Sequence, residues 1–273
     1  MSDEHTRLAP TSAGPVACHV RGAGPAIVLL HASPGDARDY DAVAAALADG
    51  RTVIRLDWPG YGDSPAPDGP AGAIQFAQVL DEVIAELRAA EHGPVVLVGN
   101  SVGGYAALAY ALREPARVAG LVLIAPGGFT RLNPVSRAVC RLMGAPAAAR
   151  WLLGPLASVY TWRRTPVAKA ALRRAYAAAR DPRRRAVASA VWRSFLDPAH
   201  DLRGRAPELT VPVLLTWGRG DPVLPLASDG RRAARLLPGA RLVRFWCGHE
   251  PHAEMPEAWL AAVGTFLATL PSA

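Results

Sequence analysis

The chain has 273 residues, of which 51% are hydrophobic, and a formal net charge of +7. This composition supports a large core, and the length fits one α/β domain with an insertion better than two independent domains. The first ten residues are polar and no run of about 18 apolar residues occurs, so neither secretion nor a membrane span is predicted. Cys18, Cys140 and Cys247 are far apart and lack metal-ligand or CxxC spacing, so we expect a cytoplasmic protein without a bound metal.

Apolar runs alternate with amphipathic segments along most of the chain. The expected strands lie at 16–20, 26–30, 52–56, 95–98, 118–124, 211–217 and 240–246. The expected helices lie at 40–48, 74–90, 102–112, 226–236 and 257–270, the first capped by Asp36 or Asp39. Such alternation predicts an α/β fold with a largely parallel sheet, whose ligand site lies at the carboxyl ends of the strands.

Residues 127–206 form a compositionally separate block. The block contains fifteen arginines and Lys169 but only three aspartates, which gives it a net charge of +13. No acidic residue occurs between Glu114 and Asp181. Breaks are expected at Pro134, Pro146, Pro155, Pro166 and Pro182. We therefore predict several short helices forming a cap, inserted into a core made of 1–126 and 207–273.

The charge of this block has three interpretations. A solvated helical surface is favoured, steering of an anionic substrate is the second, and nucleic acid or membrane binding is the third. No nucleic-acid-binding motif interleaves the arginines. Trp151, Trp162 and Trp192 either line a pocket or fill the core of the cap, and we favour the core for at least two of them.

One stretch, VVLVGNSVGGY at 95–105, combines a strand, a sharp turn and a helix. Ser101 stands at the turn, and a residue in so tight a turn needs neighbours without bulk two positions before and after it. These neighbours are Gly99 and Gly103, while Gly104 lets the helix approach the sheet. The pattern predicts a nucleophile elbow, although a glycine-rich turn without chemistry has the same letters.

Two further loops after strands carry the partners that a serine nucleophile needs. Asp221 follows the strand at 211–217, and His249 follows the last strand, where Gly248 gives it freedom to turn inward. Imidazole suits a general base because its ordinary pKa lies near neutrality. Asp229 and Glu250 could replace Asp221 as the acid, and His252 could replace His249 as the base.

These motifs resemble the α/β-hydrolase superfamily over nearly the whole chain. The segments that carry the resemblance are HASPG at 31–35, DWPGYGDS at 57–64, GNSVGG at 99–104, WGRGDPVLP at 217–225 and CGHEPHAEMP at 247–256. The resemblance implies an α/β-hydrolase fold with a Ser-Asp-His triad. GNSVGG, APGG at 125–128, LLTWGRGD and CGH are most similar to meta-cleavage-product C-C hydrolases, which act on dienone acids. Those enzymes have a glycine-rich oxyanion loop and a tryptophan three residues after the histidine, where this chain has HASPG and His252.

A serine hydrolase also needs donors for a developing oxyanion. The elbow supplies the backbone N–H of Val102, and the resemblance implies that the second donor is the N–H of Ser33, since Pro34 has none. His31 is expected to order this loop. Turn geometry rather than catalysis is expected of four residues in the next loop: Asp57, Gly60, Gly62 and Ser64.

The sequence thus predicts a serine hydrolase that cleaves an ester of a small, largely apolar molecule, without cofactor or metal. The alternatives are C-C bond cleavage of an anionic ketone, with a cap arginine holding the carboxylate, and a ligand-binding protein without catalysis. The expected partner is a small-molecule substrate and not a nucleic acid, and the oligomeric state is left open. The remaining histidines are expected at the surface or in packing: His5, His19, His92 and His200.

Overall fold

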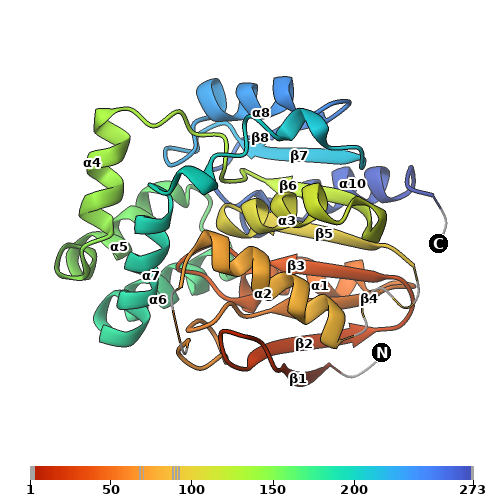
Figure 1. Cartoon of the computed structure of the whole chain (residues 1–273), viewed down its shortest axis with the longest axis horizontal. Helices are drawn as coiled ribbons and strands as arrows, with labels where there is room; N and C mark the ends of the chain where they lie inside the picture. Colours follow the sequence, from red (N-terminus) through yellow and green to blue (C-terminus); the bar gives the residue numbers. More distant parts are fainter. Residues whose placement is uncertain are drawn as a thin grey trace.

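The computed structural model describes residues 4–67, 69, 71–87, 89, 91 and 93–271, and a single eight-stranded sheet runs through it (Figure 1). The strands lie in the order β1-β2-β4-β3-β5-β6-β7-β8. Their bounds are β1 His5–Ala9, β2 Val16–Gly22, β3 Ala26–Leu30, β4 Thr52–Leu56, β5 Val95–Asn100, β6 Val118–Ile124, β7 Val213–Gly218 and β8 Arg241–Phe245. β2 is antiparallel to β1 and β4, and all other pairs are parallel. The predicted mostly parallel sheet is confirmed.

Helices cover both faces of this sheet. The helices of the core are α1 Asp41–Leu47, α2 Ala73–Glu86, α3 Val102–Arg113, α8 Arg231–Leu236, α9 Pro251–Glu254 and α10 Pro256–Leu267. Residues of α2, α3 and α8 share one apolar cluster with the sheet, and residues of α1 and α10 share the other. The central strands therefore have no polar face: along β3, Ile27 and Leu29 pack into one cluster, and Val28 and Leu30 pack into the other.

Four further helices lie together beyond one end of the sheet, at the left of Figure 1. They are α4 Pro134–Met143, α5 Pro146–Tyr160, α6 Pro166–Arg180 and α7 Pro182–Ser194. Each begins with a proline, whose fixed φ suits the first helical position and whose missing N–H costs nothing there. The break expected at Pro155 was wrong, because this exposed proline lies inside α5.

The connections add short 3₁₀ and π turns to these elements. They are η1 Ala37–Tyr40, η2 Pro115–Arg117, η3 Pro198–His200, η4 Ala206–Glu208 and η5 Leu226–Gly230. Asp36 caps η1, which leads into α1, so the expected cap lies one turn before the α-helix. The helix expected at 226–236 is divided between η5 and α8.

Other expectations differ from the structure in detail. β1 and α9 were not predicted, and β2 and β3, which the sequence predicts as a pair of strands joined through 22–25, are separated in the sheet by β4. His92 and the expected end of α2 at Ala90 lie outside the described residues. The tryptophan prediction was wrong, because the exposed fractions are 71% for Trp151 and 53% for Trp162. No helix within the described ranges is long and apolar enough to cross a bilayer.

Candidate active site

Ser101 occupies the sharp turn between β5 and α3. Its backbone φ of 54° and ψ of −112° lie in a region that side-chain-bearing residues rarely adopt. The turn closes only because its glycines have no side chain: a Cβ at Gly99 would lie 2.4 Å from the carbonyl oxygen of Gly103, and a Cβ at Gly103 would lie 2.3 Å from that of Leu30. The Ser101 N–H donates to Ile124 (3.0 Å), so β6 holds the turn in place.

His249 and Asp221 meet at the carboxyl end of the sheet. Nδ1 of His249 donates to Oδ2 of Asp221 over 2.6 Å, and both side chains are buried. The other oxygen, Oδ1, accepts the backbone N–H groups of Val223 (2.9 Å) and Leu224 (3.0 Å). The carboxylate is therefore held by its own loop, and the proton on Nδ1 leaves Nε2 of His249 free to accept another.

Tyr160, at the end of α5, holds the loop of His249 in place. The backbone N–H of His249 donates to the carbonyl oxygen of Tyr160 (2.8 Å), and the Tyr160 ring lies edge-on to the imidazole at 5.5 Å. Gly248 does not need a positive φ here. A Cβ at Gly248 would lie 1.8 Å from the same carbonyl oxygen, so glycine is required by close approach rather than by conformational freedom.

Glu254, which the sequence analysis did not single out, joins the two segments. Its Oε2 accepts the N–H groups of Trp162 (2.7 Å), Arg163 (2.7 Å) and Gly248 (3.1 Å), and Oε1 accepts that of Glu250 (3.2 Å). The side chain is 2% exposed. One buried carboxylate thus binds the chain after α5 to the loop that carries His249.

His31 holds the loop after β3 in place, as the sequence predicts. Its Nδ1 donates to the carbonyl oxygen of Ala32 (2.7 Å), and its Nε2 accepts the N–H of Trp58 (3.0 Å). Ser33 Oγ lies 2.7 Å from the Tyr61 hydroxyl. Among the described residues, the N–H groups of Ser33 and Val102 donate to no other group, as donors reserved for a ligand would.

The neighbouring turn is structural, as expected. Asp57 accepts the N–H groups of Ala37 (2.7 Å) and Asp63 (2.9 Å), and its carboxylate lies 3.1 Å from His19. A Cβ at Gly62 would lie 2.1 Å from that carboxylate. These contacts hold the turn in its shape.

Two adjoining cavities meet at Ser101. The smaller, of about 30 Å³, is lined by Ser33, Ser101 and His249, together with mostly apolar side chains: Leu153, Leu156, Tyr160, Trp192, Phe195 and Val223. The larger, of about 1150 Å³, runs from Ser101 and Val102 outward between α4 and η5. The structure therefore brings Ser33, Ser101 and His249 to one small space that opens into a broad cleft.

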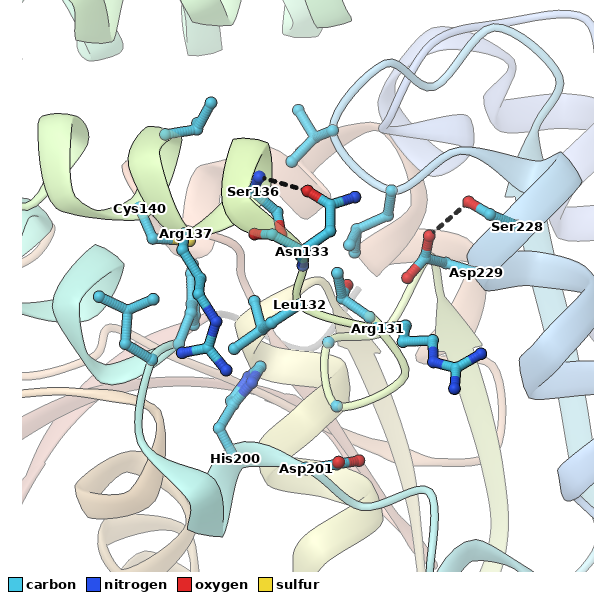
Figure 2. A pocket seen from close by; sticks show the side chains of 18 of the residues that line it. Arg131, Leu132, Asn133, Ser136, Arg137, Cys140, His200, Asp201, Ser228 and Asp229 are labelled. Atoms are coloured by element: carbon cyan, nitrogen blue, oxygen red, sulfur yellow. Dashed lines mark hydrogen bonds between the residues drawn. The ribbon is translucent and has the colours of Figure 1, made fainter.

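The broad cleft holds polar groups that sequence reasoning missed. His200 of η3 is 9% exposed, and its Nε2 has no hydrogen-bond partner. Figure 2 shows Arg137 of α4 reaching toward His200 across the cleft. Burial lowers the pKa of His200 to about 4. His200 is thus a neutral group in the wall of the cleft, although it also packs on Tyr105 as a packing residue would.

The rival residues have other partners, although Asp229 lines the broad cleft. Asp229 binds Ser228 (2.6 Å) and Arg232 (3.5 Å), and Glu250 is buried beside other carboxylates. Burial, together with the charges of Asp39 and Glu254, raises the pKa of Glu250 well above its usual range. His252 stacks on Tyr40 at 4.5 Å and is absent from the lining of both cavities.

The comparisons with known proteins agree with this geometry. Residues 27–263 match the model of the alpha/beta hydrolase family. The chain belongs to that family. This alpha/beta hydrolase is 33% identical to a pimeloyl-[acyl-carrier protein] methyl ester esterase of Aromatoleum aromaticum, covering 85% of this chain and 94% of the relative. It is also 33% identical to a 2-hydroxy-6-oxononadienedioate/2-hydroxy-6-oxononatrienedioate hydrolase of Burkholderia vietnamiensis, covering 89% and 86%.

Solved structures give the same result. The alpha/beta hydrolase superposes on a hydrolase of Pseudomonas aeruginosa with a TM-score of 0.82 and 25% identity, covering 97% of this chain and 99% of the other. An enol-lactonase of Burkholderia xenovorans gives a TM-score of 0.79 and 25% identity, covering 96% and 100%. The predicted family and its resemblance to C-C hydrolases are confirmed, and the chain is a hydrolase.

Proposed function

We propose that this hydrolase cleaves a carboxylic ester of a small, largely apolar molecule through a Ser101-His249-Asp221 triad. The observation that carries the proposal is the 2.6 Å hydrogen bond between His249 and Asp221, made beside a cavity that His249 shares with Ser101. The apolar side chains around that cavity favour an apolar acyl or alcohol group. The esterase among the relatives supports the same function.

In this proposal each group has a step. Ser101 Oγ attacks the ester carbonyl and passes its proton to Nε2 of His249, while Asp221 keeps the imidazole oriented and stabilises its charge. The N–H groups of Ser33 and Val102 would bind the oxyanion. His249 then protonates the leaving alcohol, and a water activated by the same imidazole hydrolyses the acyl-enzyme.

The α4–α7 helices serve in this proposal as a cap over the site, inserted as residues 127–206. Leu153, Leu156 and Tyr160 of α5 and Trp192 of α7 line the small cavity, so the helices supply the wall opposite the sheet. A small-molecule substrate and a cytoplasmic location belong to the same proposal. The cytoplasmic location is supported by the three cysteines, which are buried and form no disulfide.

Labelling with a serine-directed fluorophosphonate tests the nucleophile. The adduct should map to Ser101 by peptide mass spectrometry, and Ser101→Ala should abolish it. Ser136→Ala, in the outer cleft, is the matched control and should label like the unmodified protein. An adduct on another serine, or full labelling of Ser101→Ala, would overturn the assignment.

The role of Asp221 has a separate test. Asp221→Asn keeps the shape but can hold the imidazole in the wrong tautomer, so kcat should fall by about 10³-fold or more. Asp229→Asn is the control because, within the described part of the chain, that carboxylate contacts Ser228 and Arg232 and not a histidine. Equal losses in the two variants would contradict the proposed triad.

A second candidate, C-C hydrolysis of an anionic ketone, is favoured by the arginines of the cleft. Arg131 and Arg137 line it, and no described carboxylate forms an ion pair with either. A relative that hydrolyses a dienedioate is consistent with such a substrate. For a carboxylate substrate, kcat/KM should fall as salt rises from about 0.01 to 0.15 M, since the Debye length shortens from about 30 to 8 Å. Equal, flat salt profiles for that substrate and its methyl ester would exclude this candidate.

A further inference from the structure

Helix α4 carries an exposed apolar stripe. Cys140 and Met143 pack inward, whereas Val135, Val139 and Leu142 are 72%, 43% and 51% exposed. These three are spaced by four and three residues, so they form one stripe along the helix. The solvent-facing side of α4 thus carries three apolar side chains, at positions where a helix of a globular protein usually has polar ones.

Helix α5, which contacts α4, repeats the pattern. Leu153 and Ala157 pack inward, while the exposed fractions of Trp151, Leu152 and Val159 are 71%, 36% and 59%. Exposed leucines occur singly on most proteins, but six exposed apolar side chains on two contacting helices call for a partner. We call these six residues the α4–α5 apolar face: Val135, Val139, Leu142, Trp151, Leu152 and Val159.

The charge around this face has one sign. α4 and α5 contain Arg137, Arg141 and Arg150, all exposed, and neither helix contains an acidic residue. The guanidinium of Arg150 lies 5.3 Å from the ring centre of Trp151. Exposed apolar side chains, a tryptophan and arginines on amphipathic helices are the features of segments that bind in the plane of an anionic bilayer surface.

We propose that the α4–α5 apolar face docks the protein on an anionic lipid surface. The arginines supply attraction to lipid phosphates, and the apolar side chains enter the boundary between head groups and acyl chains. A nucleic acid would use the arginines and leave the apolar stripe in water. A protein partner would have to combine an apolar groove of matching shape with acidic residues around it, whereas an anionic lipid surface meets both features without a matched groove.

The position of the face relative to the cleft strengthens the case. Val135 and Val139 are exposed and also line the cleft that leads to Ser101. In Figure 1, α4 is at the far left of the molecule, at the end distant from α10. Docking through α4 would therefore place the mouth of the cleft at the lipid surface while the sheet stays in water.

Co-sedimentation with vesicles tests the proposal. The unmodified protein should bind vesicles rich in phosphatidylglycerol and not vesicles of phosphatidylcholine alone. The double variant Leu142→Ser/Trp151→Ser should bind at least about tenfold more weakly. Arg141→Gln/Arg150→Gln should bind about 30-fold more weakly, and salt raised from about 0.1 to 1 M should weaken binding of the unmodified protein.

The matched controls lie away from α4 and α5. Leu8→Ser removes a side chain that is 62% exposed on β1, and Arg235→Gln removes an exposed charge on α8; neither should change binding. None of the substituted residues lines either cavity, so thermal unfolding and turnover of a soluble ester should stay unchanged in all variants.

Three results would overturn the proposal. The first is absence of binding to phosphatidylglycerol vesicles, and the second is binding by Leu142→Ser/Trp151→Ser that equals that of the unmodified protein. The third is a dimer in light scattering that these two substitutions convert to a monomer without changing vesicle binding. This third result would assign the face to another copy of the chain.

Discussion

Replacing Glu254 by glutamine should loosen the loop that carries His249. The carboxylate accepts four backbone N–H groups, three at Oε2 and one at Oε1. In Glu254→Gln the amide oxygen can keep the three bonds of Oε2. The amide NH₂ then takes the place of Oε1 and points a donor at the N–H of Glu250.

The magnitude follows from these four bonds. A hydrogen bond to a charged acceptor contributes about 1 kcal/mol more than one to a neutral acceptor, so the three retained bonds all weaken. The buried N–H of Glu250 loses its acceptor, which costs about 1–3 kcal/mol. Relief of the repulsion between Glu254 and Glu250 offsets part of the loss. We expect the free energy of unfolding to fall by about 2–4 kcal/mol.

Urea denaturation measures this change, and steady-state kinetics on the best ester measures its effect at the site. Displacement of the His249 loop by a fraction of an ångström should lower kcat by about tenfold or more. Glu257→Gln is the matched control, because Glu257 is an exposed carboxylate at the start of α10. If Glu254→Gln stays within about 0.5 kcal/mol of this control, the reasoning on the four bonds is refuted.

Three further predictions concern histidines. His249→Ala should lose about 10³-fold or more in kcat while His252→Ala keeps most of it, because His252 lines neither cavity; equal losses would contradict the assignment. His200→Leu removes an unpartnered Nε2 from the cleft, so KM for esters with a polar acyl group should rise without loss of stability, and an unchanged KM would contradict this role. A hydrogen bond to Asp57 raises the pKa of His19. Burial alone would raise the pKa of Asp57, but this hydrogen bond and other contacts outweigh burial, so the pKa of Asp57 is lowered. The pair therefore stabilises the fold between the ordinary values of 3.8 and 6.5, and its contribution is lost as pH rises through the folded pKa of His19. His19→Gln should thus cost more stability at about pH 5 than at about pH 9, by about 1 kcal/mol or less, and a loss independent of pH would count against the pair.

Much of the fold could be predicted because its signals are local. A strand buried on both faces is an uninterrupted apolar run, as in β3 and β5, and a proline at the first helical position marks each of α4–α7. Pro155 shows the limit of such a rule. On the exposed side of α5 the carbonyl that loses its partner can face water, and the sequence letters do not show which side of a helix meets water.

Within the site, the sequence alone determined the elbow, since the requirement for Gly99 and Gly103 acts over a few bonds around Ser101. Only the tertiary structure decided which carboxylate meets His249, because Asp221, Asp229 and Glu250 have the same chemistry and differ only in where their loops end. The same holds for Glu254, whose partners include residues more than ninety positions away in the chain. Steric exclusion around a turn is fixed by neighbouring residues, whereas a buried charge selects its partners only after the sheet and the α4–α7 helices have come together.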